Sequence, residues 1–98
     1  MSANLFALNN LIAANLVTYT REEPHYNTVY TATPGNVLFA VDDEGFIKLD
    51  RIVNDGNWVI AYDTEGFDFV LDSEEPTVGA MDANGFNILY GDMTLNVA

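Results

Sequence analysis

Three copies of a short acidic pattern are the first candidates for chemistry in this chain. The pattern is D-x-[E/N]-G-F, and each copy stands between two apolar runs. The copies begin at Asp42, Asp63 and Asp82. Carboxylates grouped in loops can bind calcium, act as general acids and bases, or simply form turns. The sequence therefore offers three interpretations of one repeated loop.

Turn formation explains every residue of the pattern. Asp at the first position and Gly at the fourth are favoured in a type I turn, and the Gly also supplies the left-handed conformation of a G1 bulge. The Asp side chain can accept a hydrogen bond from the N–H two residues further on. We expect Phe46, Phe67 and Phe86 to begin the return strands on the buried face. The pattern predicts three β-hairpins.

Calcium binding and catalysis are weaker interpretations of these loops. An EF-hand loop has Gly at its sixth position and Glu at its twelfth, whereas Gly is fourth here. Of the three residues at the twelfth position, Val53, Glu74 and Met93, only Glu74 is acidic. A general acid needs a raised pKa, which a solvated turn does not provide. We therefore expect no cofactor, no metal and no enzyme, while loops that cluster in space leave calcium as an alternative.

Other catalytic and metal-binding chemistry lacks its residues. The chain has no cysteine and one histidine, His25, which excludes thiolate metal sites and a disulfide framework. The only serines, Ser2 and Ser73, do not stand in a nucleophile-elbow motif, and no phosphate-binding glycine motif is present.

Charge is the most unusual property of the sequence. Fifteen acidic residues face three basic ones, giving a net charge of −12. Residues 1–20 carry no charged side chain, whereas residues 42–92 carry thirteen acids and two bases. Such a field repels nucleic acid and anionic membranes and attracts basic surfaces. Solubility alone is the competing explanation of this charge.

Apolar spacing predicts one helix followed by strands. Leu5, Leu8 and Ile12 have helical spacing, and the composition favours extended structure from Leu16 onward. We therefore expect a helix over 1–15 and β structure over 16–98. Alternation places five sets on the buried face: Val37, Phe39 and Val41; Trp58, Ile60 and Tyr62; Phe67, Phe69 and Leu71; Phe86, Ile88 and Tyr90; and Met93, Leu95 and Val97.

The expected fold class is α+β and mostly β, in a single domain over 1–98. The connections between strands are short, so successive strands should pair as an antiparallel meander of roughly seven to eight strands. The sheet should be strongly curved and packed on the helix, and barrel closure is an alternative. The N-terminal segment lacks the basic region of a secretory signal and is interrupted by Asn residues, so it is expected to belong to the fold, with no membrane span.

The repeats lie about twenty residues apart, which predicts that three acidic tips emerge along one edge of the sheet. The candidate partner-binding residues are Asp42, Asp43, Glu44, Asp63, Glu65 and Asp82. The expected partner is a basic, nucleic-acid-binding protein, and direct nucleic-acid binding is not expected with so few basic residues.

This surface is typical of an inhibitor that mimics nucleic acid, of the anti-restriction or anti-CRISPR type, acting in the cytoplasm of a host cell and encoded by a phage or mobile element. The alternative is an assembly subunit, for instance of a virus particle, that forms a homo-oligomer through the uncharged residues 1–20.

Overall fold

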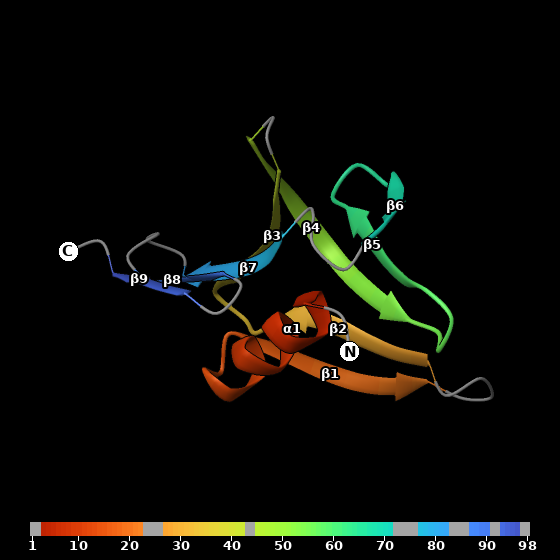
Figure 1. Ribbon diagram of the computed structural model, residues 1–98, viewed down its shortest axis with the longest axis horizontal. Coiled ribbons are helices and arrows are strands. Elements are labelled where there is room, and N and C mark those ends of the chain that lie inside the picture. The colour runs from red at the N-terminus through yellow and green to blue at the C-terminus, as the bar shows by residue number, and fades with distance from the viewer. Residues whose placement is uncertain are drawn as a thin grey trace.

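The computed structural model describes residues 3–22, 27–42, 45–71, 77–82, 87–90 and 93–96, with side chains over 7–22, 27–41, 45–71 and 78–82. One helix and one antiparallel sheet of nine strands make up these residues (Figure 1). The elements are α1 (Ala3–Ala13), β1 (Val17–Glu22), β2 (Asn27–Ala32), β3 (Asn36–Asp42), β4 (Gly45–Asn54), β5 (Val59–Asp63), β6 (Asp68–Val70), β7 (Thr77–Asp82), β8 (Asn87–Tyr90) and β9 (Met93–Asn96). The expected mostly β fold is confirmed. No helix in this part of the chain is long and apolar enough to cross a membrane.

The helix is short and ends in a Schellman motif. The N–H of Leu16 donates to the carbonyl of Leu11, and the N–H of Asn15 donates to the carbonyl of Ile12, both at 3.0 Å. Asn15 has a φ of 62°, the left-handed conformation that this motif requires. The chain therefore leaves the helix where the change in composition predicted, and Leu16 packs back against the core that contains Leu11.

The sheet curves around the helix. α1 contacts both β1 and β7, although the strand order β1-β2-β4-β3-β7-β8-β9 places three strands between them. Only a curved sheet brings both strands to one helix, and Figure 1 shows α1 lying across the hollow of that curve. The sheet is open, because β1, β6 and β9 each pair with one described strand only. The barrel alternative is not realised.

The strand order departs from a simple meander at two connections. β2 does not pair with β3; instead β2 and β3 lie end to end along one edge of β4, with Tyr30 opposite Ile52 and Leu38 opposite Leu49. The Pro34–Gly35 turn, in which Gly35 has a φ of 89°, diverts the chain and returns it to the same edge of β4. The second exception is β7, which pairs with β3 and not with β6.

The core lies between α1 and the concave face of the sheet. Its buried members are Leu8, Leu11, Val17, Tyr30, Leu38, Ala40, Leu49, Ile52, Ala61, Leu71, Val78 and Ala80. Phe69 packs against this cluster, so the prediction for Phe69 and Leu71 is confirmed.

Several predicted core residues lie elsewhere. In β5 the core residue is Ala61, opposite Ile52, and Trp58 is 59% exposed. Ile60 and Tyr62 are only half-buried and lie on the face away from the helix. The 58/60/62 alternation is real, but it belongs to the other face, because the pairing of β5 with β4 sets which residues point inward.

β3 also differs from its prediction, because both of its faces are covered. Leu38 and Ala40 enter the core, while Phe39 is buried on the opposite face against Phe46, with ring centroids 5.7 Å apart. Phe46 itself is 58% exposed and Phe67 is 68% exposed. The prediction that these two phenylalanines are buried is wrong, because both lie next to hairpin ends, beyond the reach of the core. Phe86 lies outside the described residues.

Candidate functional site

The β5–β6 hairpin carries the acidic pattern in its best-defined form. The Oδ1 atom of Asp63 accepts hydrogen bonds from the N–H groups of Glu65, at 2.8 Å, and of Phe67, at 3.0 Å. The N–H of Gly66 donates to the carbonyl of Asp63 at 3.2 Å, and the N–H of Asp63 donates to the carbonyl of Phe67 at 2.9 Å. With a φ of 94° at Gly66, this is a type I turn with a G1 bulge, as the sequence predicted.

A second loop, between β4 and β5, uses the same chemistry. The Oδ1 atom of Asp55 accepts hydrogen bonds from the N–H groups of Asn57, at 2.9 Å, and of Trp58, at 2.8 Å. The N–H of Gly56 donates to the Oδ1 atom of Asn54. These backbone hydrogen bonds, that to Trp58 first, lower the pKa of Asp55 below its usual value. The repeated pattern did not point to this loop, although its Asn-Asp-Gly sequence is itself a turn signal.

Two of the three acidic hairpins point the same way. Asp42 pairs with Gly45 at the end of β3, and Asp63 pairs with Leu49 at the end of β5. Both β3 and β5 run antiparallel to β4 and end toward its first half, so the two hairpins share one end of the sheet (Figure 1). Asp43 and Glu44 lie outside the described residues.

The third acidic position lies at the other end of the sheet. Asp82 is opposite Asn36, the first residue of β3, whereas Asp42 is the last. The prediction of three acidic tips along one edge is therefore wrong for Asp82. The reason is that β7 pairs antiparallel with β3, so β7 ends where β3 begins.

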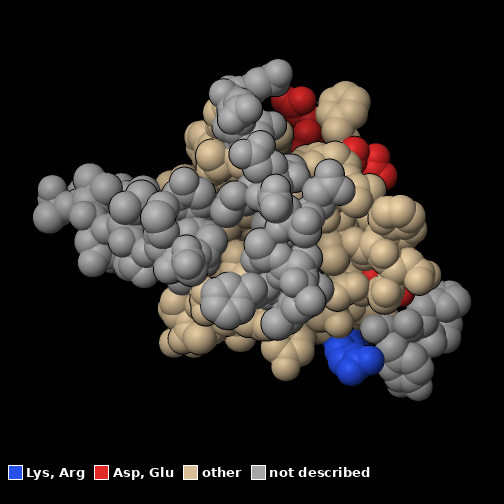
Figure 2. Space-filling model, in the orientation of Figure 1, with Lys and Arg blue, Asp and Glu red and all other residues tan. Residues whose placement is uncertain are grey.

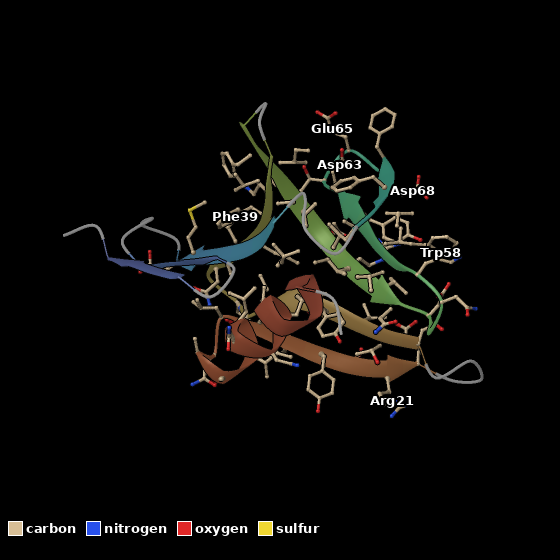
Figure 3. All side chains as sticks on the ribbon, viewed as in Figure 1. Arg21, Phe39, Trp58, Asp63, Glu65 and Asp68 are labelled. Carbon is tan, nitrogen blue, oxygen red and sulfur yellow. The ribbon has the colours of Figure 1, made fainter. Side chains whose placement is uncertain are left out.

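Carboxylates and an exposed aromatic ring meet on the β5–β6 hairpin. Glu65 and Asp68 are exposed, Asp63 is half-buried beneath its turn, and Phe67 stands between them in the sequence. Figure 3 shows the three labelled acids gathered on this hairpin, and Figure 2 shows acidic side chains at the same corner of the molecule. We call Asp63, Glu65, Phe67 and Asp68, with the neighbouring end of the β3–β4 hairpin, the acidic end.

The helix side of the sheet carries a separate groove. It encloses about 400 Å³ and is lined by Asn9, Ile12, Tyr19, Arg21, Thr28 and Tyr30. Arg21 is on this side of the molecule (Figure 3), and it provides the basic surface seen at the lower right of Figure 2. Burial is the largest cause that raises the pKa of Tyr30, whose ring lies 6.3 Å from that of Tyr19.

The acidic end presents carboxylates to solvent and has no metal-binding cluster among its described side chains. Within the described ranges, no three His, Cys, Asp or Glu side chains are grouped closely enough to hold a metal ion. Asp63 uses one carboxylate oxygen to hold its own turn, whereas Glu65 and Asp68 are exposed to solvent.

No protein-family model matches the chain, and neither a characterised protein nor a solved structure is significantly similar to it.

Proposed function

We propose that this protein is a non-enzymatic binding module whose acidic end docks on a basic, nucleic-acid-binding surface of a partner protein and inhibits that partner by occupying the surface. The observation that carries the proposal is the β5–β6 turn. There Asp63 fixes the backbone of Glu65 and Phe67, so a carboxylate and an aromatic ring are presented together on a rigid support.

The two kinds of side chain contribute differently to binding. A net charge of −12 steers the molecule toward basic surfaces and accelerates encounter. Exposed charges on the rim of an interface add little affinity by themselves, whereas an aromatic side chain that fills a pocket is a typical hot spot. Phe67, at 68% exposed, is suited to that role. In this proposal the acids give specificity for a basic partner, and the Phe67 ring contributes most of the affinity.

The test starts from a partner that is captured on the immobilised protein at low salt and eluted at high salt. Its affinity is then measured for the wild type, for Glu65→Lys with Asp68→Lys, and for Phe67→Ser. We expect each variant to lose at least about ten-fold in affinity, and wild-type binding to weaken with salt. A nucleic acid that binds the partner should compete with the wild-type protein.

Glu22→Lys with Asp50→Lys is the charge-matched control, because both acids are exposed, lie outside the acidic end and do not hold a turn. If this control loses as much affinity as the Glu65 and Asp68 reversal, only net charge matters and the proposed site is wrong. If nucleic acid does not compete, the proposed mimicry is wrong.

The alternative is an assembly subunit that uses residues 1–20, of which the structure describes the side chains of residues 7–20. Among these, Leu11 and Val17 are 0% and 1% exposed and belong to the core of the same chain. Within residues 7–20, a homo-oligomer would use exposed residues such as Asn9, Ala13 and Tyr19.

A further inference from the structure

The face of the sheet away from α1 carries a continuous apolar row. Strand register places Val29 opposite Val53, Val53 opposite Ile60, and Ile60 opposite Val70, across β2, β4, β5 and β6. Their inward neighbours in sequence, Tyr30, Ile52 and Ala61, are core residues, so the row faces the other way. We call Val53, Trp58, Ile60 and Val70 the outer row.

The outer row is accessible to solvent at the β5–β6 side. Trp58 is 59% exposed and Val70 is 43% exposed, while Val53 and Ile60 are half-buried. Trp58 has the same parity as Ile60 in β5, and its backbone N–H is fixed by Asp55 at 2.8 Å. An exposed indole on a fixed backbone, beside β-branched side chains, is an apolar surface of the kind that protein interfaces bury.

Charge is nearly balanced beside this row, in contrast to the net charge of −12 of the whole chain. Register places Arg51 opposite Tyr62, and Tyr62 opposite Asp68. The guanidinium of Arg51 lies 4.1 Å from the Tyr62 ring centroid and pairs with Asp50 at 2.9 Å. Lys48, opposite Phe39, lies on the same outer face of β4 as Phe46, because the two residues are two positions apart in the strand. Two of the three basic residues of the chain therefore accompany three acids on this face, Asp50, Asp68 and Glu22.

We propose that the outer row is the contact surface for a second copy of this chain, in a two-fold dimer that packs the outer faces of two sheets together. Two molecules of net charge −12 repel one another, so they can associate only where the local charge is near zero. The outer face meets that condition and is self-complementary. In a two-fold arrangement each Arg51 meets a surface that contains acids, and each apolar row meets its equivalent.

A basic partner is disfavoured as the occupant of this face, because Arg51 and Lys48 would repel it. The two proposed surfaces share Asp68 and are otherwise distinct: the acidic end meets a basic protein, and the outer face meets another copy. The salt dependence of the two contacts has opposite sign. Salt screens the repulsion between two copies and should strengthen the dimer, whereas it weakens the attraction between the acidic end and a basic partner.

The test is sedimentation equilibrium of the full chain over a wide concentration range at low and high salt. We expect a monomer–dimer equilibrium that shifts toward the dimer as salt increases. Trp58→Ser with Val70→Thr should weaken the dimer at least about ten-fold. Tyr19→Ser is the control, since Tyr19 is an aromatic side chain of similar exposure, 54%, on the helix side of β1. Thermal unfolding of each variant shows that it is folded.

Two results would overturn the proposal. The first is a wild-type protein that stays monomeric up to about 1 mM at both salt concentrations. The second is a dimer that survives in the Trp58 and Val70 variant or is lost in the Tyr19 control. Neither result bears on capture of a basic partner by the acidic end, so the two proposals can fail separately.

Discussion

The backbone N–H of Trp58 donates to the Oδ1 atom of Asp55 at 2.8 Å, so a carboxylate holds the residue that immediately precedes β5 in place. Asp63 does the same for Phe67 at 3.0 Å. Trp58 and Phe67 are the two most exposed large apolar side chains in the described part of the chain. The acids of these turns therefore act on the backbone, and they fix the main chain at two exposed aromatic residues.

Acid should destabilise the protein through Asp55. Its pKa is lowered in the folded state from an ordinary value of 3.8, so its contribution to stability is present above that value and is lost as the pH falls through the lowered pKa. Asp55→Asn should therefore lower the melting temperature at neutral pH. The difference from the wild type should shrink at a pH of about 2.5. Glu65→Gln removes the same charge without altering the β4–β5 loop and serves as the control.

Gly66→Ala should destabilise the β5–β6 hairpin by about 1–2 kcal/mol. A Cβ atom at Gly66 would meet nothing within 4 Å, so the whole cost comes from the φ of 94°. Gly66→Asn should cost less, because Asn tolerates the left-handed conformation better than Ala. Urea denaturation measures both changes, and equal costs for Ala and Asn would contradict this explanation.

Substitutions in β5 test which face is buried. Ala61 is fully buried opposite Ile52, so Ala61→Leu should overpack the core and cost about 1–3 kcal/mol. Ile52→Ala should cost about 2–5 kcal/mol because it leaves a cavity. Trp58→Ser, at an exposed position, should have a much smaller effect on the free energy of unfolding of the monomer. The opposite order would show that Trp58, and not Ala61, faces the core.

Alkaline pH should destabilise the protein through Tyr30. Burial raises the pKa of Tyr30 above 10.0, which means that the folded state retains its proton where the unfolded chain loses it. The contribution is complete below the unfolded pKa and is lost as the pH rises toward the folded pKa. Tyr30→Phe should reduce the fall in melting temperature above pH 10.

Local chemistry was the part of this fold that the sequence could predict. Asp63 and Gly66 specify their turn through hydrogen bonds and conformations within five residues, and Asn15 ends the helix in the same local way. Long-range pairing was less predictable. Pro34–Gly35 resembles a hairpin turn that would pair β2 with β3. Instead, β2 and β3 both pair with the same edge of β4, and no residue near the turn predicts this pairing.

The candidate site was predicted in part for the same reason. The acids of the β5–β6 hairpin lie where the repeat predicted them. Asp82 lies at the opposite end of the sheet, because β7 pairs antiparallel with β3. Alternation in 58–62 identified two faces correctly but not which of them is covered. That choice depends on Ile52 lying opposite Ala61, a contact between residues on different strands.

β4 has a consequence for the order in which the protein can be made. It forms ladders with β2, β3 and β5, while β2 and β3 have no ladder with each other. A ribosome that has released residues only as far as Asp42 has produced β1, β2 and β3 without the strand that unites them. The helix contacts β7 as well as β1, so the sheet can curve around the helix only after Asp82 has emerged, and until then the core lacks Val78 and Ala80.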